Sequence, residues 1–369
     1  MLRRILMAAM FSTVVGCGSN ENTSSTTAEK SQQQFNWKLV TSWPKNYPGL
    51  GMASERFAKH VAKMSNGRLK VKVLGANELV PAFEVFDAVS QGTSEMGHAA
   101  AYYWRGKSPA SLFFTAVPFG LTAQEMNGWL HHGGGMALWR ELYAEFNLLP
   151  LAGGNTGVQM GGWFNREINS VEDLKGLKMR IPGLAGEVLN RAGGTAVSMP
   201  GGEIYTAMQT GVIDATEWVG PANDKAFGLQ EVAKYYYYPG WQEPGPTLEF
   251  TINLDAWNSL PPDLQAIVEV AAMAVNQDML DEYTVQNANA LPALAQTEGI
   301  EILEFPDDVM SALYKVSTEV LDELAAEGPF AARVYQSYKE YRDKVYAYHR
   351  ISERAYINAR EKAIKALEH

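Results

Sequence analysis

Between residues 35 and 101, segments in which apolar residues alternate with polar ones, as in strands, take turns with segments in which apolar residues recur at helical spacing. Residues 37–41 and 69–74 have the pattern of strands, and in the second run apolar side chains occupy every other position. Residues 52–64 and 81–91 place apolar side chains at helical spacing, and Asn66-Gly67 marks a turn before the second strand. Strands that alternate with helices in this way predict βαβ units and a mainly parallel sheet.

A second series of the same kind follows a break at Pro118-Phe119-Gly120 and a helical stretch at residues 123–146. Its predicted strands are residues 149–152, 158–164, 178–181, 196–198, 212–216, 235–238 and 247–254, and its predicted helices are residues 184–191 and 202–209. We expect residues 35–154 to form mainly a first lobe, to which later segments return, and residues 155–254 to form mainly a second. Several crossings between these lobes suit the order of elements better than a single linker.

Residues 255–369 have a helical pattern throughout. The predicted helices are residues 262–294, 307–326 and 331–367, the first of them starting at Pro261-Pro262. In the last helix, apolar residues recur at alternating spacings of four and three: Val334, Tyr338, Tyr341, Val345 and Tyr348. Such a seam lies either on the body of the protein or on a second copy of it.

The first residues are typical of an export signal. Residues 1–16 hold Arg3 and Arg4 and then an apolar stretch too short to span a bilayer. Residues 14–17 fit a bacterial lipobox, so we predict cleavage before Cys17 and lipidation of its thiol; an ordinary signal peptide, with Cys17 incidental, is the alternative. Residues 17–34 are almost free of apolar side chains and predict a flexible tether. The expected location is the periplasm or cell envelope, with the membrane reached only through the lipid.

Charge and composition exclude several classes of function. The formal net charge is −10, and removal of Arg3 and Arg4 with the signal leaves −12, without a basic run that would favour nucleic acid or phospholipid headgroups. Cys17 is the only cysteine, and neither a G-x-S-x-G elbow nor a G-x-G-x-x-G fingerprint is present. His131-His132 is the only histidine cluster, and we expect solvated or capping roles there rather than a metal site.

Three segments between residues 154 and 221 space one amide, one arginine and one acid as a binding pocket would. They are residues 154–164, 174–183 and 212–221, and Arg180 and Glu217 each close a short strand-like run just before a proline. A guanidinium is a planar fork that binds a carboxylate with two hydrogen bonds. The alternative interpretation is a structural Arg–Glu ion pair at strand ends, and spacing alone does not separate the two.

Aromatic residues gather at one predicted strand end. Tyr102, Tyr103 and Trp104 follow the strand-like run that ends near residue 101, and the carboxyl ends of strands are where open α/β sheets bind ligands. Core packing is the alternative for at least one of them. Further aromatics that could line the same cleft are Trp163, Phe164 and Trp218.

The chain resembles the solute receptors of tripartite ATP-independent periplasmic (TRAP) transporters, from residue 37 to about residue 360. The resemblance is carried by GRLKV (67–71), QGTSEMG (91–97), VPFG (117–120), LKGLKMRIP (174–182) and QTGVIDA (209–215), which together are highly specific. It implies a two-lobed α/β fold like that of periplasmic binding proteins, with multiple crossings and long C-terminal helices. The implied partners are a small carboxylate, the permease subunits in the membrane, and a second copy held through the C-terminal helix.

The resemblance also implies a site. Arg180 would bind the ligand carboxylate, and the surrounding residues resemble the branch that binds 2-oxo or 2-hydroxy monocarboxylates with Na⁺ or Ca²⁺. In that branch a glutamine, an acid and a tryptophan carbonyl hold the cation, which here gives Gln159, Glu217 and Trp218, with Glu243 as a less certain addition. Asn155, Tyr102 and Tyr103 are further expected ligand contacts. Two other functions stay open: a metal-assisted enzyme acting on 2-oxo acids, and a co-receptor for a membrane sensor.

Overall fold

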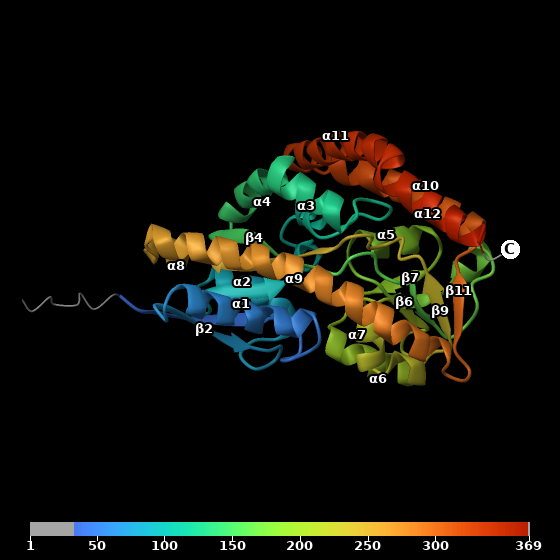
Figure 1. Ribbon diagram of the computed structural model, residues 1–369, viewed down its shortest axis with the longest axis horizontal. Helices are drawn as coiled ribbons and strands as arrows, with labels where there is room; N and C mark the ends of the chain where they lie inside the picture. Colours follow the sequence, from blue (N-terminus) through green and yellow to red (C-terminus); the bar gives the residue numbers. More distant parts are fainter. Residues whose placement is uncertain (1–32, 368–369) are drawn as a thin grey trace, which may run out of the picture. The chain divides into compact units, whose positions relative to one another are not determined.

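The computed structural model describes residues 33–367 (Figure 1). The predicted signal peptide at residues 1–16, the lipidation site Cys17 and nearly all of the predicted tether at residues 17–34 lie outside the described residues. Residues 34–369 form one compact unit by their internal contacts. The predicted lobe boundaries after residues 154 and 254 therefore stay predictions.

The first sheet has five strands in the order β2-β1-β3-β10-β4. Their bounds are β1 (Phe35–Thr41), β2 (Leu69–Leu74), β3 (Met96–Ala99), β4 (Leu148–Asn155) and β10 (Thr247–Asn253). β1 pairs in parallel with β2 and β3, whereas β10 runs antiparallel to both β3 and β4. β10 comes from far along the chain and inserts into the first sheet between the earlier strands β3 and β4.

The second sheet has six strands in the order β11-β9-β5-β8-β6-β7. Their bounds are β5 (Gly162–Phe164), β6 (Lys178–Arg180), β7 (Thr195–Val197), β8 (Ala215–Thr216), β9 (Tyr235–Tyr238) and β11 (Glu301–Glu304). The expected mainly parallel sheet is confirmed, although β10 in the first sheet and β5 in the second each run antiparallel to both of their neighbours. The reason is that β5 and β10 each follow a segment that crosses from one sheet to the other, which reverses their direction relative to their neighbours.

Twelve α-helices cover the sheets of the described chain (Figure 1). Their bounds are α1 (Leu50–Met64), α2 (Val85–Ser90), α3 (Ala123–His132), α4 (Gly135–Ala144), α5 (Gly183–Arg191), α6 (Ile204–Gln209), α7 (Pro221–Ala226), α8 (Leu254–Ser259), α9 (Pro262–Ala295), α10 (Asp307–Ala326), α11 (Pro329–Ile351) and α12 (Glu353–Lys365). Short 3-10 helices are η1 (Ala82–Glu84), η2 (Ala101–Trp104), η3 (Pro109–Phe114), η4 (Val171–Leu174), η5 (Gly201–Glu203) and η6 (Leu229–Glu231).

Two predicted elements are corrected. The single helix expected at residues 331–367 is broken at Ser352, whose backbone leaves the helical region and whose hydroxyl donates to the Tyr348 carbonyl oxygen at 3.0 Å. Serine offers the backbone this alternative bond and so weakens a helix interior. The predicted strand at residues 158–164 is regular only over Gly162–Phe164, because residues 155–161 form a crossing between the sheets.

We call the part of the molecule around the first sheet and the part around the second sheet its two halves. The long helix α9 spans both (Figure 1). It packs against β4 and α1 beside the first sheet and against α7 beside the second. Arg56 of α1 donates to Asp278 of α9 at 2.7 Å, and the Asn287 side chain of α9 accepts from the backbone amide of Ala222 at 3.0 Å. α9 therefore connects the two halves over most of its length.

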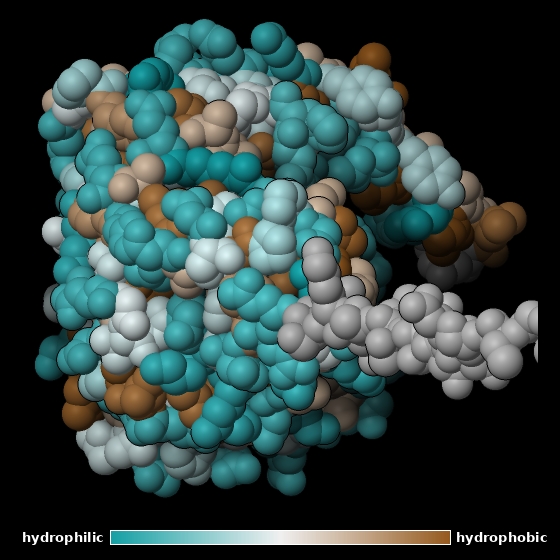
Figure 2. Space-filling view, turned by 90° about the vertical axis from the view of Figure 1, so that its left-hand side faces the viewer, coloured by the Kyte–Doolittle hydropathy of each residue, from teal (hydrophilic) through white to brown (hydrophobic). Residues whose placement is uncertain are grey.

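The last helices divide their contacts between the halves. α10 packs against α5 and η4 beside the second sheet, while α11 packs against η3, α3 and α4 beside the first. The face drawn in Figure 2 is covered mainly by hydrophilic side chains, with hydrophobic ones in small separate groups. Within residues 33–367, no helix has the length and apolar content needed to cross a membrane.

Candidate functional site

The site is built where the chain crosses between the sheets. One crossing joins β4 to β5 and the other joins β9 to β10. The two run side by side: the Gln159 amide donates to the Glu243 carbonyl oxygen at 3.2 Å, and the Gly240 amide donates to the Gln159 carbonyl oxygen at 2.9 Å. These backbone bonds bring Gln159 and Glu243 together although 84 positions separate them.

Arg180 ends β6 and points into this region. Its side chain is 1% exposed, and its Nη1 donates to Glu217 Oε1 and, at 3.3 Å, to the Glu217 carbonyl oxygen. Nε donates to the Met199 carbonyl oxygen at 3.3 Å, and Nη2 reaches the Tyr103 hydroxyl at 3.5 Å. The guanidinium carbon also lies 5.2 Å from the centre of the Trp218 ring. The fork is therefore held in one orientation by contacts on several sides.

Glu217 follows β8 and is as deeply buried as its partner. Burial raises the pKa of Glu217 to about 7, against the opposing effect of the Arg180 charge. Only Oε1 is bonded to Arg180; Oε2 is buried and has no hydrogen-bond partner within the described chain. A buried carboxylate oxygen without a partner is costly unless something else binds it.

Gln159 presents a second such oxygen. Its Nε2 donates to Glu243 Oε2 at 2.8 Å and to Thr156 Oγ1 at 3.2 Å, while its Oε1 is buried and has no partner among the residues the structure describes. Burial, together with the nearby charge of Glu217, raises the pKa of Glu243 well above its usual range. Glu243 therefore takes up a proton more readily than an exposed glutamate does.

Tyr102 and Tyr103 form the wall on the first-sheet side. They lie in η2, directly after β3, and burial raises the pKa of both hydroxyls, that of Tyr103 to about 12. Both therefore stay protonated and able to donate hydrogen bonds. The Tyr102 ring packs on the start of α5, where a methyl group added to Gly183 would lie 3.2 Å from a ring carbon. This contact joins the two halves beside the site.

Three other expected residues lie elsewhere in the arrangement. Asn155 is fully buried and joins the crossings: its Nδ2 donates to the Gly245 carbonyl oxygen at 3.0 Å, and its Oδ1 accepts from the Gly157 amide at 2.9 Å. Its role as a ligand contact stays a prediction. Trp163 and Phe164 are packed in the core, stacked on Tyr236 and edge-on to Phe305 respectively, instead of lining a cleft.

The donor set fits a hard cation. Gln159 Oε1 and Glu217 Oε2 are oxygens that lack partners, and no hydrogen bond within residues 33–367 reaches the Trp218 carbonyl oxygen. Na⁺ and Ca²⁺ prefer carboxylate, amide and backbone oxygens of this kind. Within residues 33–367, no group of three or more His, Cys, Asp or Glu side chains could hold a metal ion.

Three contributors were missed in the sequence. The Tyr47 hydroxyl accepts from Trp218 Nε1 at 3.1 Å, Met199 supplies a carbonyl oxygen to Arg180, and Asp224 accepts from the backbone amides of Val219 and Gly220. A backbone acceptor such as Met199 leaves no mark in a sequence. Asp224 does leave a weak one, an acid just after Gly220-Pro221 at a helix start.

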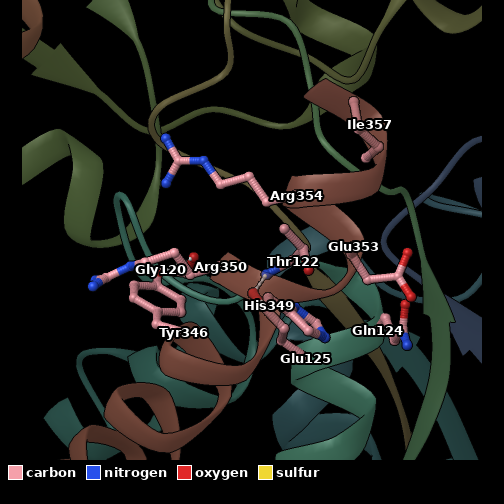
Figure 3. Close-up of a pocket in the computed structure, with 10 residues that line it drawn as sticks. All are labelled: Gly120, Thr122, Gln124, Glu125, Tyr346, His349, Arg350, Glu353, Arg354 and Ile357. Carbon is pink, nitrogen blue, oxygen red and sulfur yellow. Dashed lines mark hydrogen bonds and ion pairs between the residues drawn. The ribbon is translucent and has the colours of Figure 1, made fainter. Parts of the chain in front are cut away.

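Two cavities differ in their distance from the residues described above. The nearer one, of about 290 Å³, is lined by Tyr102, Tyr103 and the start of α5. A larger one of about 480 Å³ lies away from Arg180, between α3 and the α11–α12 break (Figure 3). There His349 lies against Glu125, with 2.6 Å between Nδ1 and Oε1, while Arg350 and Arg354 extend away from that pair. Convergent buried polar atoms, and not volume, favour the Arg180 region as the ligand site.

A family model described as bacterial extracellular solute-binding protein, family 7, matches residues 39–328. The chain belongs to this family. A relative described as a monocarboxylate 2-oxoacid-binding periplasmic protein, from Nostoc sp., is 45% identical over 360 residues, which cover 96% of this chain and 98% of that protein. The family's described role is solute binding, which is the coarser part of the functional prediction.

Solved structures confirm the resemblance to TRAP receptors and the predicted two-lobed α/β fold. A TRAP periplasmic solute-binding protein from Pseudoalteromonas atlantica, with bound sodium and pyruvate, has a TM-score of 0.86 and 45% identity, covering 88% of this chain and 99% of its own. Another from Colwellia psychrerythraea, with bound calcium and pyruvate, also has a TM-score of 0.86, with 44% identity and coverage of 89% and 100%.

Proposed function

We propose that this chain is the solute receptor of a TRAP transporter and captures a 2-oxo monocarboxylate, such as pyruvate, together with Na⁺ or Ca²⁺. The observation that carries the proposal is a buried guanidinium, Arg180, beside two partnerless oxygens, Gln159 Oε1 and Glu217 Oε2. The bound pyruvate, sodium and calcium of the two solved relatives support the same ligand class.

The chemistry of the site suits an acid with a neighbouring oxygen. One carboxylate oxygen would pair with Nη2 of Arg180, whose one hydrogen bond, to the Tyr103 hydroxyl, is long at 3.5 Å. The other, with the adjacent keto or hydroxyl oxygen, would chelate the cation. The cation itself would be held by Gln159 Oε1, Glu217 Oε2 and the Trp218 carbonyl oxygen, with Glu243 next to it. Hydroxyls of Tyr102 and Tyr103, kept protonated by burial, would donate to the ligand from the first-sheet side.

Charge also favours a ligand pair over a bare acid. Arg180 and Glu217 compensate each other, so a monocarboxylate alone would bring an uncompensated negative charge into a buried site. A cation that enters with the ligand removes that cost. We therefore expect carboxylate and cation to bind with positive cooperativity.

The test is calorimetric titration of the full mature protein with pyruvate, longer 2-oxo acids, lactate and dicarboxylates, each with and without NaCl or CaCl₂. Pyruvate is expected to bind in the presence of cation and much more weakly after chelation and dialysis. If no carboxylic acid binds under any of these conditions, the proposal is wrong.

The finer assignments of anchor and assembly are part of the same proposal. We propose lipidation at Cys17, which mass spectrometry of the purified protein tests directly. We also propose a homodimer through the C-terminal helices, because α12 has no buried residue and leaves Ile351, Tyr356 and Ile364 exposed beside it or on it. Light scattering of the full chain and of a chain ending at Ser352 tests this: only the full chain should form a dimer.

A further inference from the structure

Asp224 lies in the first turn of α7 and is 1% exposed. Its carboxylate accepts hydrogen bonds on both oxygens. Oδ1 accepts from the backbone amides of Val219, at 3.1 Å, and Gly220, at 3.0 Å. Oδ2 accepts from Trp163 Nε1, at 3.1 Å, and from the Tyr236 hydroxyl, at 2.7 Å. One side chain thus joins a turn of the backbone to two strands of the second sheet.

The turn it holds carries the proposed cation ligands. Residues 217–220 follow β8 directly and include the Glu217 side chain and the Trp218 carbonyl group. Past the end of β8 at Thr216, two backbone bonds hold the turn, from the Glu217 amide to the Arg180 carbonyl oxygen at 3.2 Å and from the Met160 amide to the Val219 carbonyl oxygen at 3.1 Å. Neither of them engages the amides of Val219 and Gly220, which only Asp224 accepts from. The two amides bonded to Asp224 come immediately after Trp218, so the direction of the Trp218 carbonyl depends on where Asp224 Oδ1 lies.

We propose that Asp224 is a positioning residue for the cation: it fixes the turn at residues 217–220 so that the Glu217 carboxylate and the Trp218 carbonyl face the same point. This inference rests on the proposed function, since it concerns the cation of that site. Asp224 itself does not bind the ion, because both of its oxygens already accept two donors each.

The same turn is where the two halves meet. Trp218 Nε1 donates to the Tyr47 hydroxyl at 3.1 Å, and that hydroxyl donates to the Asn223 carbonyl oxygen at 2.7 Å. Asn223 Nδ2 in turn donates to the Pro48 carbonyl oxygen at 2.9 Å. A displaced turn would lose these bonds as well, so the ordering by Asp224 serves both the cation and the contact between the halves.

The experiment compares three variants of the mature protein. Asp224→Ala removes both acceptor oxygens, Asp224→Asn keeps one oxygen for the turn amides, and Tyr236→Phe disturbs only the sheet side of Asp224. Each variant is titrated with CaCl₂ and with NaCl at saturating pyruvate, and its melting temperature is measured. Hydrogen exchange of a peptide covering residues 217–223 is followed in the cation-free and ligand-free protein.

Across the variants, cation affinity should correlate with the exchange protection of the turn and not with the melting temperature of the whole protein. We expect Asp224→Ala to lose exchange protection of the turn and at least 100-fold in Ca²⁺ affinity. Asp224→Asn should keep most of the protection and lose less than tenfold, and Tyr236→Phe should melt earlier but bind Ca²⁺ within threefold of the wild type. Should Asp224→Ala fail to fold, a loss above 100-fold in either of the other two variants would overturn the proposal.

Other outcomes are also decisive. Unchanged protection or Ca²⁺ affinity in Asp224→Ala overturns the inference, and so does an affinity that follows melting temperature across the three variants. A wild-type protein that binds pyruvate without any cation dependence overturns the proposed function and this inference with it. A cation-dependent wild type with an indifferent Asp224→Ala overturns the inference alone.

Discussion

Replacement of Arg180 tests whether its guanidinium serves the ligand or only its neighbour. Arg180→Ala leaves Glu217 buried without its partner, and breaking a buried pair in this way costs about 3–5 kcal/mol. Part of that stability loss is relieved because Glu217, whose pKa burial already raises, takes up a proton. The protonated carboxyl group no longer attracts a cation, so ligand affinity should fall further than stability does.

The expected loss in affinity follows from the charges at the site. Truncation of one partner of a buried charge pair at a binding site costs about 2–5 kcal/mol, roughly 30-fold to several thousand-fold in Kd. Arg180→Lys keeps the charge but cannot reach Met199, Glu217 and Tyr103 together, since an ammonium group is a point donor and not a fork. We expect its pyruvate affinity to lie between those of the wild type and the Ala variant.

The assay is calorimetric titration of pyruvate at saturating CaCl₂, with melting temperatures measured in parallel. Arg191→Ala is the matched control, because Arg191 is partly exposed on α5 and pairs with Glu187 and Glu323 at the surface. Such surface pairs contribute about 0–1 kcal/mol to stability, and they lie outside the buried site, so the pyruvate affinity of Arg191→Ala should equal that of the wild type. Pyruvate binding by Arg180→Ala within threefold of the wild type would refute the anchor role and leave only a structural ion pair.

Three further predictions concern closure, stability and the cation. Gly183→Ala should weaken pyruvate binding at least tenfold in calorimetry, because its methyl group would lie 3.2 Å from the Tyr102 ring at a φ of +67°, whereas Gly176→Ala, with φ +69° and open space, should not. Burial raises the pKa of Glu249 to about 7, so between pH 4.5 and 7 the native state keeps a proton that the unfolded chain releases, and Glu249 alone should lower stability with rising pH by about 1.4 kcal/mol per unit. Urea unfolding at pH 5–8 checks this: Glu217 and Glu243 add slopes of the same sign, so Glu249→Gln should reduce the slope without abolishing it, and an unchanged slope would contradict the prediction. Gln159→Leu removes one partnerless oxygen and should lower Ca²⁺ affinity at least tenfold by titration, with equal affinity counting against a cation at Gln159.

The main elements of the fold were predictable where a period repeats. β2 was found from its strict alternation and α10 from its amphipathic run, while α9 was found from its length and its start at Pro261-Pro262. α7 and β11 were not predicted, because neither PANDKA (221–226) nor EILE (301–304) places apolar residues at a helical or alternating period. The membership of β10 in the first sheet depends on pairing with distant strands, which local sequence does not record.

The candidate site was predictable in part for a similar reason. Arg180 and Glu217 could be singled out because a charged residue at the end of a short apolar run is unusual, and Gln159 entered through the family resemblance. Tyr47 could not be found, since it meets Trp218 across 171 positions of the chain. The distinction between a structural ion pair and a ligand anchor also needed atoms, because it depends on which oxygen of Glu217 lacks a partner.

The split attachment of the C-terminal helices has a mechanical consequence. α10 packs on the half that contains β6, and α11 packs on the half that contains β3, yet the two helices also pack directly on each other. An opening between the two halves would therefore shear α10 along α11. A covalent staple between these helices would lock the receptor in one state without touching the carboxylate.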